Sequence, residues 1–96
     1  MGAKKQLDYS ARFIANMEAI RDYIALDNPA AANRVLQTVL SSAEELIDFP
    51  LLGHAGQRAE TRELVLSKYP YTLVYRLTAN KVRIVAMIHQ SRKHPA

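Results

Sequence analysis

The 96-residue sequence contains no cysteine, which excludes a disulfide framework and a thiolate zinc site. It has no apolar run near the roughly 18 residues that a membrane helix needs, so we expect no membrane span. The N-terminal segment MGAKKQLDYS lacks the apolar stretch of a secretory signal, and Gln6 stands where the N-myristoylation pattern has Ser or Thr. Together these absences favour a cytoplasmic protein.

Common catalytic and ligand-binding motifs are also missing. Gly53 and Gly56 follow a predicted helix rather than a strand, so they do not match a phosphate-binding loop. Ser91 has a histidine nearby but no orienting acid, which argues against a serine hydrolase. His54 and His94 lack partners at ligand spacing, so we expect no metal and no other cofactor.

The positive charge is concentrated in the second part of the chain. Residues 58–96 hold eight Lys or Arg and two acids, a net charge of +6, whereas residues 1–57 hold five and seven, a net charge of −2. The apolar fraction of 49% is sufficient for a folded domain. The asymmetry predicts an anionic partner for the C-terminal part, either nucleic acid or an acidic protein segment.

Two amphipathic helices are predicted in the first half of the chain. Ser10 suits the N-cap of the first helix, whose apolar residues recur at helical spacing between positions 13 and 24. Asn28 and Pro29 suit the cap and first turn of a second helix, whose apolar stripe runs from 35 to 47. Because the link between them is so short, the helices should form an antiparallel hairpin.

Alternating apolar and polar residues predict strands after the helices. The runs at 62–67, 71–77 and 81–89 have this pattern, and residues 50–61 are predicted to form a loop. A short run at 5–9 is a candidate edge strand. The predicted architecture is α+β, in a single domain over residues 1–96: a short N-terminal strand and an antiparallel two-helix hairpin (7–49) packed on a three- to four-stranded antiparallel sheet (62–89), followed by a basic tail (90–96).

The last two predicted strands place like charges opposite each other on the outward face. Opposed arginines repel in a sheet, so Glu63 on the neighbouring strand or an anionic ligand should offset them; a plain solvated face is the alternative. His89 is predicted to end the last strand on this face, either as part of the basic surface or bonded to a backbone carbonyl. A hairpin that turns at residues 79–80 predicts three opposed pairs: Arg76 with Arg83, Val74 with Val85, and Thr72 with Met87.

Four short motifs in order resemble the RelE/ParE toxin superfamily of type II toxin–antitoxin modules. They are YIALDNPAAANRV, LIDFPLLGHAG, RELVLSKYPYTLVYRL and VRIVAMIHQSRKHP, and the resemblance runs from Leu7 to Pro95. The DNPAAA link, the FP-x-x-G loop and the RELV…PY…VYR run are typical of the ParE branch. The resemblance implies a β-α-α unit followed by an antiparallel sheet, to which the N-terminal strand is added.

The resemblance implies two alternative activities. ParE-like toxins of plasmid-stabilisation modules are associated with inhibition of DNA gyrase, and they need no chemistry of their own. RelE-like toxins are ribosome-dependent mRNA endoribonucleases, and they often carry a catalytic Tyr or His near the C-terminus. No Tyr follows Tyr75 here, which leaves His89 and His94 as acid–base candidates and favours the gyrase inhibitor. A basic binding module that has lost its toxicity is a third alternative.

The implied partner is a cognate antitoxin, a small protein with a DNA-binding domain and a tail that folds over the toxin's helical hairpin and sheet. An acidic, amphipathic tail would suit the half with a net charge of +6. The residues predicted to bind the target or the antitoxin are Arg62, Arg76, Arg83, His89, Arg92 and Lys93. All but Lys93 are also the catalytic candidates if the protein is a nuclease.

Overall fold

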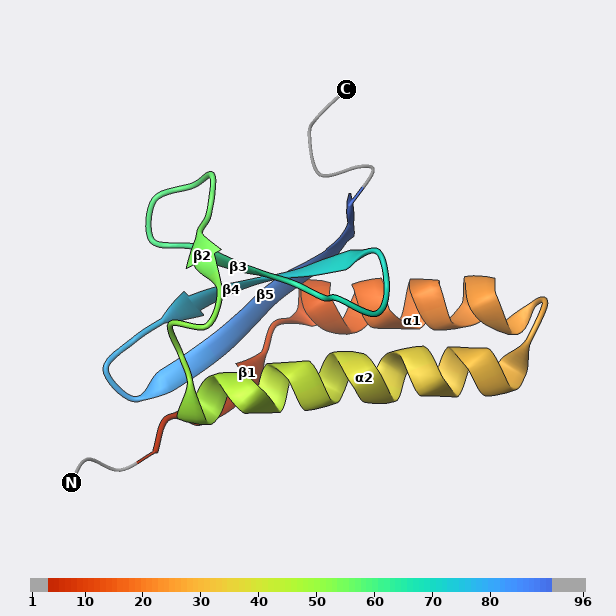
Figure 1. Ribbon diagram of the computed structural model, residues 1–96, viewed down its shortest axis with the longest axis horizontal. Coiled ribbons are helices and arrows are strands. Elements are labelled where there is room, and N and C mark those ends of the chain that lie inside the picture. Colours follow the sequence, from red (N-terminus) through yellow and green to blue (C-terminus); the bar gives the residue numbers. More distant parts are fainter. Residues whose placement is uncertain (1–3, 91–96) are drawn as a thin grey trace.

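The computed structural model describes residues 4–90 and has two layers, a pair of helices and a five-stranded sheet (Figure 1). The strands are arranged in the order β1-β5-β4-β3-β2; β1 runs parallel to β5 and the other neighbours are antiparallel. The elements are β1 (Gln6–Tyr9), α1 (Ala11–Ala25), α2 (Pro29–Asp48), β2 (His54–Ala55), β3 (Arg62–Val65), β4 (Tyr71–Leu77) and β5 (Lys81–His89).

The predicted α+β fold, with a helical hairpin on one side of a sheet, is confirmed, although the sheet differs from the prediction in two respects. It is mixed rather than antiparallel, because β1 pairs in parallel with residues 81–84 of β5. It also has a fifth strand, β2, inside the segment predicted to be a loop, where His54 and Ala55 pair with β3. Two residues are too few to show the alternation by which a strand is recognised.

Both predicted helix caps are present. The Ser10 hydroxyl oxygen accepts a hydrogen bond from the Phe13 N–H at 3.0 Å. The Asn28 side chain accepts one from the Ala31 N–H at 3.1 Å, and Pro29 occupies the first turn of α2, where no N–H is needed. Asn28 and Pro29 lie at the short link between α1 and α2, and the two helices lie side by side (Figure 1).

The core lies between the helices and one face of the sheet. Each large side chain buried there stabilises the fold by about 1.5–3 kcal/mol relative to an exposed position. No helix in the stretch from residue 4 to residue 90 is both long and apolar enough to cross a membrane. The largest fully buried apolar side chains are Tyr75, Phe13, Leu46, Leu73, Ile84, Val39 and Val82.

A register shift in the β4–β5 hairpin changes which face of the sheet the later side chains of β5 occupy. Arg76 lies opposite Arg83, as predicted, but the register shifts between Val74 and Tyr75. Val85 is the extra residue on β5, which fits a β-bulge. The other two predicted pairs are therefore wrong: Val74 pairs with Ala86 rather than Val85, and Thr72 pairs with Ile88 rather than Met87.

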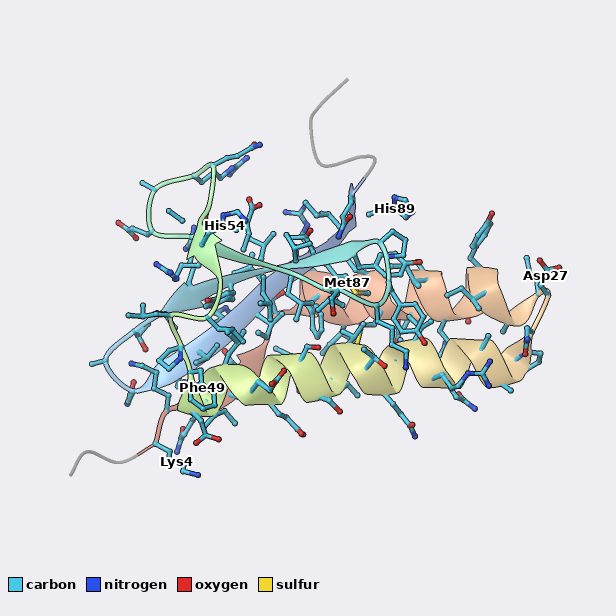
Figure 2. The ribbon with its side chains drawn as sticks, in the orientation of Figure 1. Lys4, Asp27, Phe49, His54, Met87 and His89 are labelled. Atoms are coloured by element: carbon cyan, nitrogen blue, oxygen red, sulfur yellow. The ribbon has the colours of Figure 1, made fainter. Side chains whose placement is uncertain are left out.

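The shift places the side chains at the end of β5 on the opposite sheet face from the one predicted. One inserted residue moves every later side chain to the opposite face, so Met87 and His89 lie on the helix side of the sheet (Figure 2). Met87 is buried in the core, and the outward placement predicted for it and for His89 is wrong. Side chains near α1 hold this part of β5: the Ser10 hydroxyl donates to the Val85 carbonyl at 2.6 Å, and the Asn16 side chain accepts from the Met87 N–H at 3.1 Å.

Candidate anion-binding site

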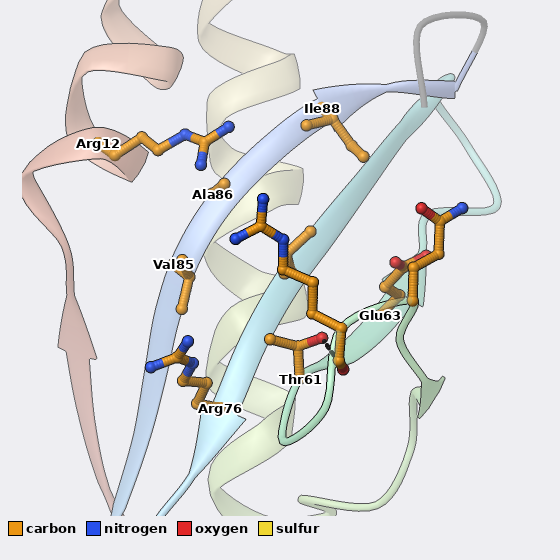
Figure 3. Close-up of a pocket in the computed structure, with 10 residues that line it drawn as sticks. Arg12, Thr61, Glu63, Arg76, Val85, Ala86 and Ile88 are labelled. Carbon is orange, nitrogen blue, oxygen red and sulfur yellow. Dashed lines mark hydrogen bonds between the residues drawn. The ribbon is translucent and has the colours of Figure 1, made fainter. Parts of the chain in front are cut away.

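The sheet face that turns away from the helices contains a hollow of about 420 Å³ (Figure 3). Its lining combines side chains from the sheet, from α1 and from the loop before β3. Arg12 reaches over β5 from α1, and Arg76 rises from β4, with Val85 and Ala86 between them (Figure 3). We call this space the arginine hollow; it is lined by Arg12, Gln57, Arg58, Thr61, Glu63, Val74, Arg76, Val85, Ala86 and Ile88.

A compact loop contributes Arg58 to the arginine hollow. The Gly56 N–H donates to the Thr61 carbonyl at 2.8 Å, and the Thr61 hydroxyl donates to the Arg58 carbonyl at 2.8 Å. Glu60 has a φ of 69°, in the left-handed region, which closes the turn. Gly56 must be glycine in this geometry, because a Cβ atom there would lie 2.5 Å from the Thr61 hydroxyl oxygen.

Three arginines of the hollow have guanidinium groups without partners among the described residues. Within residues 4–90, no ion pair and no side-chain hydrogen bond includes the guanidinium of Arg12, Arg58 or Arg76. Among the described lining residues, the one carboxylate belongs to Glu63, which is only 5% exposed. Three cations against one acid leave the hollow positive, and guanidinium groups suit the oxygens of phosphate or carboxylate.

Arg83 lies on the same sheet face but is neutralised. Its guanidinium forms an ion pair with Asp8 of β1, which lies beside it in the parallel β1–β5 pair. The predicted offset for the opposed arginines was Glu63 or an anionic ligand, whereas the structure supplies Asp8. Because Arg83 is paired, Arg76 is the member of the opposed pair that stays available to a ligand.

Arg62 has a structural contact on the other face of the sheet. It pairs with Tyr75, a core residue, and its guanidinium donates to the carbonyls of Leu51 and Gly53. The Tyr75 hydroxyl donates to the Pro50 carbonyl at 2.8 Å and accepts from the Gly53 N–H at 3.0 Å. Arg62 and Tyr75 therefore hold the segment between α2 and β2, and the structure does not bring Arg62 to the arginine hollow.

His89 is also separated from the arginine hollow. It lines a second hollow of about 580 Å³ on the α1 side, together with Tyr23, Tyr71 and Met87. The rings of His89 and Tyr71 meet edge to face, with centroids 5.4 Å apart. Burial, and to a lesser extent the neighbouring Tyr23, raise the pKa of Tyr71.

The remaining predicted site residues, Arg92 and Lys93, and the acid–base candidate His94 lie outside the described residues. Sequence reasoning missed Arg12 and Arg58 as members of one site. Arg12 carried a usable signal, since it is a cation in the first turn of a helix whose first turn has no acid. Arg58 carried none, because no periodicity describes the shape of its loop. Residues 4–90 contain no group of three or more His, Asp or Glu placed to hold a metal ion.

Sequence comparisons identify relatives along most of the chain. Residues 7–94 match the family described as the ParE toxin of type II toxin–antitoxin system, parDE. The toxin Y4kP of Sinorhizobium fredii is 31% identical over 93 residues, which cover 97% of this chain and 96% of that protein. The toxin RelE2 of Caulobacter vibrioides is 34% identical over 87 residues, covering 91% of this chain and 97% of that protein.

Solved structures share the fold at low sequence identity. The chromosomal ParDE toxin–antitoxin system of P. aeruginosa contains a chain with a TM-score of 0.81 and 20% identity, and the match covers 90% of this chain and 96% of that one. The isolated RelE toxin of E. coli has a TM-score of 0.59 and 15% identity, covering 94% and 87%. A chain of the E. coli DinJ–YafQ toxin–antitoxin complex has a TM-score of 0.59 and 14% identity, covering 93% and 96%. At these identities the likeness shows the fold alone.

Proposed function

Because this chain belongs to the ParE toxin family of type II toxin–antitoxin systems, we propose that it inhibits growth by binding DNA gyrase. Its membership confirms the resemblance to the RelE/ParE superfamily that the sequence motifs predicted. The proposal assigns the toxin a binding role rather than a reaction of its own, and places that role in the cytoplasm, where gyrase acts on DNA.

The composition of the arginine hollow supports binding without chemistry. Cleavage of RNA needs a group that takes the proton of the ribose 2′-hydroxyl and a group that gives one to the leaving oxygen. Arginine stays protonated at any physiological pH and cannot fill either role. Among residues 4–90, no histidine and no tyrosine lines this hollow, and His89 lies on the other face of the sheet. This is the observation on which the proposal chiefly rests.

A ribosome-dependent endoribonuclease is the second candidate. Glu63 lies in the same hollow as three arginines, so a carboxylate is present to exchange a proton and cations are present to stabilise a pentavalent phosphate. The Caulobacter relative, at 34% identity, carries the name RelE2. Against this candidate, Glu63 is only 5% exposed, which limits its access to a substrate hydroxyl.

The proposed partner is a cognate antitoxin. Two of the matched folds come from toxin–antitoxin complexes, the ParDE system of P. aeruginosa and DinJ–YafQ of E. coli. An antitoxin tail with acidic and aliphatic residues would complement the arginines on the sheet face. We retain Arg76 as a residue that binds the target or the antitoxin, whereas Arg83 is paired with Asp8 and would have to exchange that partner first. The roles predicted for Arg62 and His89 require contacts on the other face of the sheet.

A paired assay on the purified toxin, freed of antitoxin, tests the proposal. One arm measures supercoiling of relaxed plasmid by gyrase, and the other maps ribosome-dependent cuts in a reporter mRNA. We expect loss of supercoiling, or trapped cleaved DNA, with intact mRNA. Arg76→Gln should weaken the inhibition, and Arg34→Gln, a matched loss of one exposed positive charge on α2, should not. Cuts in mRNA with normal supercoiling would instead establish the nuclease, and inactivity in both arms would indicate a module that has lost its toxicity.

A further inference from the structure

Two arginines of the hollow occupy positions that are electrostatically unfavourable. Arg12 lies in the first turn of α1, where the helix dipole disfavours a cation, and this turn has no acid to compensate. Arg76 lies directly opposite Arg83, a placement of like charges that is unfavourable in a sheet and that is offset by the ion pair of Arg83 with Asp8. Placing positive charges at these positions lowers the stability of the fold, which indicates that they serve to bind an anionic ligand.

The arginine hollow offers little to an apolar partner. Protein interfaces depend on large apolar or aromatic anchors at their centre. The large hydrophobic side chains that are exposed in residues 4–90 lie elsewhere, and none of them lines the hollow. Its aliphatic floor is partly covered: Ala86 is 2% exposed, and Val74, Val85 and Ile88 are half-buried. The attraction that this surface can exert is therefore mainly electrostatic.

The arginine hollow also lacks a platform for unpaired bases. Proteins that bind single-stranded nucleic acid stack successive bases on aromatic side chains. None of the ten described residues that line the hollow is aromatic. A nucleic acid that keeps its own bases stacked inside a duplex, and offers only its backbone, needs no such platform.

We propose that the arginine hollow binds the phosphodiester backbone of duplex DNA, without reading its sequence. Arg12, Arg58 and Arg76 supply guanidinium groups from a helix, a loop and a strand, and such groups form charge-assisted hydrogen bonds to phosphate oxygens. This contact goes beyond the proposed inhibition of gyrase. If that proposed function holds, the contact would let a gyrase-bound toxin also hold the DNA on which the enzyme acts.

Fluorescence anisotropy of the antitoxin-free toxin with a labelled DNA duplex of arbitrary sequence tests the inference without gyrase. Affinity is measured from about 50 mM to about 200 mM salt for the native protein and for two charge-matched double variants. Arg12→Gln/Arg76→Gln removes two cations from the hollow. Arg21→Gln/Arg34→Gln removes two exposed cations from the helices and serves as the control. Circular dichroism verifies that both variants are folded.

The expected result is binding whose dependence on salt becomes shallower in the hollow variant. Losing two phosphate contacts should reduce the slope of log K against log salt by about 1.8, and the control variant should keep the native slope. Equal losses in both variants would show attraction by net charge alone and overturn the proposal. Failure to bind the duplex at low salt would overturn it, as would tighter binding of single-stranded RNA. None of these results depends on whether the toxin inhibits gyrase.

Discussion

Arg83 of β5 forms an ion pair with Asp8 of β1, its neighbour in the parallel part of the sheet. This contact neutralises one of the two arginines that face each other across the β4–β5 hairpin. Arg76, which lines the arginine hollow, has no ion-pair partner among residues 4–90, so a residue near the N-terminus determines which of these two opposed arginines is available.

Replacing the acid of this pair should expose the repulsion between the arginines. We expect Asp8→Asn to lower the free energy of unfolding by about 0.5 kcal/mol, a small value because Arg83 and Asp8 are 47% and 37% exposed. Urea denaturation measures the change. The double variant Asp8→Asn/Arg76→Gln should recover part of the loss, and a further loss in the double variant would show that the two arginines do not repel.

His89 and Arg76 should have different effects on inhibition of the target. Because His89 lies on the helix side of β5, His89→Ala should leave the inhibition of supercoiling within about twofold of the native value. Arg76→Gln should weaken it, because the arginine hollow loses a cation. Titration of each variant in the supercoiling assay checks this. If His89→Ala abolishes inhibition while antitoxin binding persists, the α1 side of the sheet is the working surface.

Tyr75 should be important for stability through its hydroxyl group as well as its ring. Tyr75→Phe removes one hydrogen bond to the Pro50 carbonyl and one from the Gly53 N–H, in a fully buried position. We expect a loss of about 1–3 kcal/mol in the free energy of unfolding, measured by urea denaturation. Tyr23→Phe is the matched control, since Tyr23 is 77% exposed and its replacement should have little effect. Equal effects would contradict a role for the buried hydroxyl.

Gly53 should not tolerate a side chain. A Cβ atom at this position would lie 2.5 Å from the Glu63 carbonyl oxygen and 2.8 Å from the Tyr75 hydroxyl oxygen. The backbone of β3 would have to move, so Gly53→Ala should destabilise the protein by about 1–3 kcal/mol. Hydrogen exchange should show lost protection in β2 and β3 before other strands. A variant with native stability and native exchange would mean that the loop can relax without cost.

Stability should decline at alkaline pH as Tyr71 and the half-buried Tyr9 ionise. Burial, and then the nearby Glu44, raise the pKa of Tyr9 above the usual 10.0, and burial raises that of Tyr71. Because the folded protein holds these protons more tightly than the unfolded chain, their contribution is complete below pH 10.0 and is lost as the pH rises through the folded-state pKa. Urea midpoints from about pH 9 to about pH 11 should fall, and less steeply in Tyr9→Phe. An unchanged slope in that variant would exclude Tyr9 as a cause.

The features that sequence reasoning predicted correctly are local. Ser10, Asn28 and Pro29 act on backbone groups within three residues of themselves, so the helix caps and the helical hairpin could be predicted from neighbours in the chain. The opposition of Arg76 and Arg83 followed from a short turn, because few residues separate them. Alternation likewise identified β3, β4 and β5.

The bulge in β5 is a tertiary feature that alternation alone does not reveal. The carbonyl of Val85 accepts its hydrogen bond from Ser10, which lies 75 residues earlier in the chain, and the Met87 N–H donates to Asn16 of α1. These distant partners hold the strand where its register shifts, and the shift moves His89 to the other face. A pattern with a period of two has no information about an inserted residue that such partners stabilise.

The arginine hollow likewise depends partly on what the sequence determines and partly on what only the tertiary structure determines. Composition was sufficient to place an excess of positive charge in the C-terminal half, since net charge is a sum that needs no geometry. Folding determined which of these charges can bind a ligand. It paired Arg83 with Asp8 and turned Arg62 toward the loop before β2. It also brought Arg12 from the acidic half of the chain to Arg58 and Arg76. The reason is physical: Coulomb energy depends on distance and burial, and only packing in three dimensions sets these for residues far apart in the sequence.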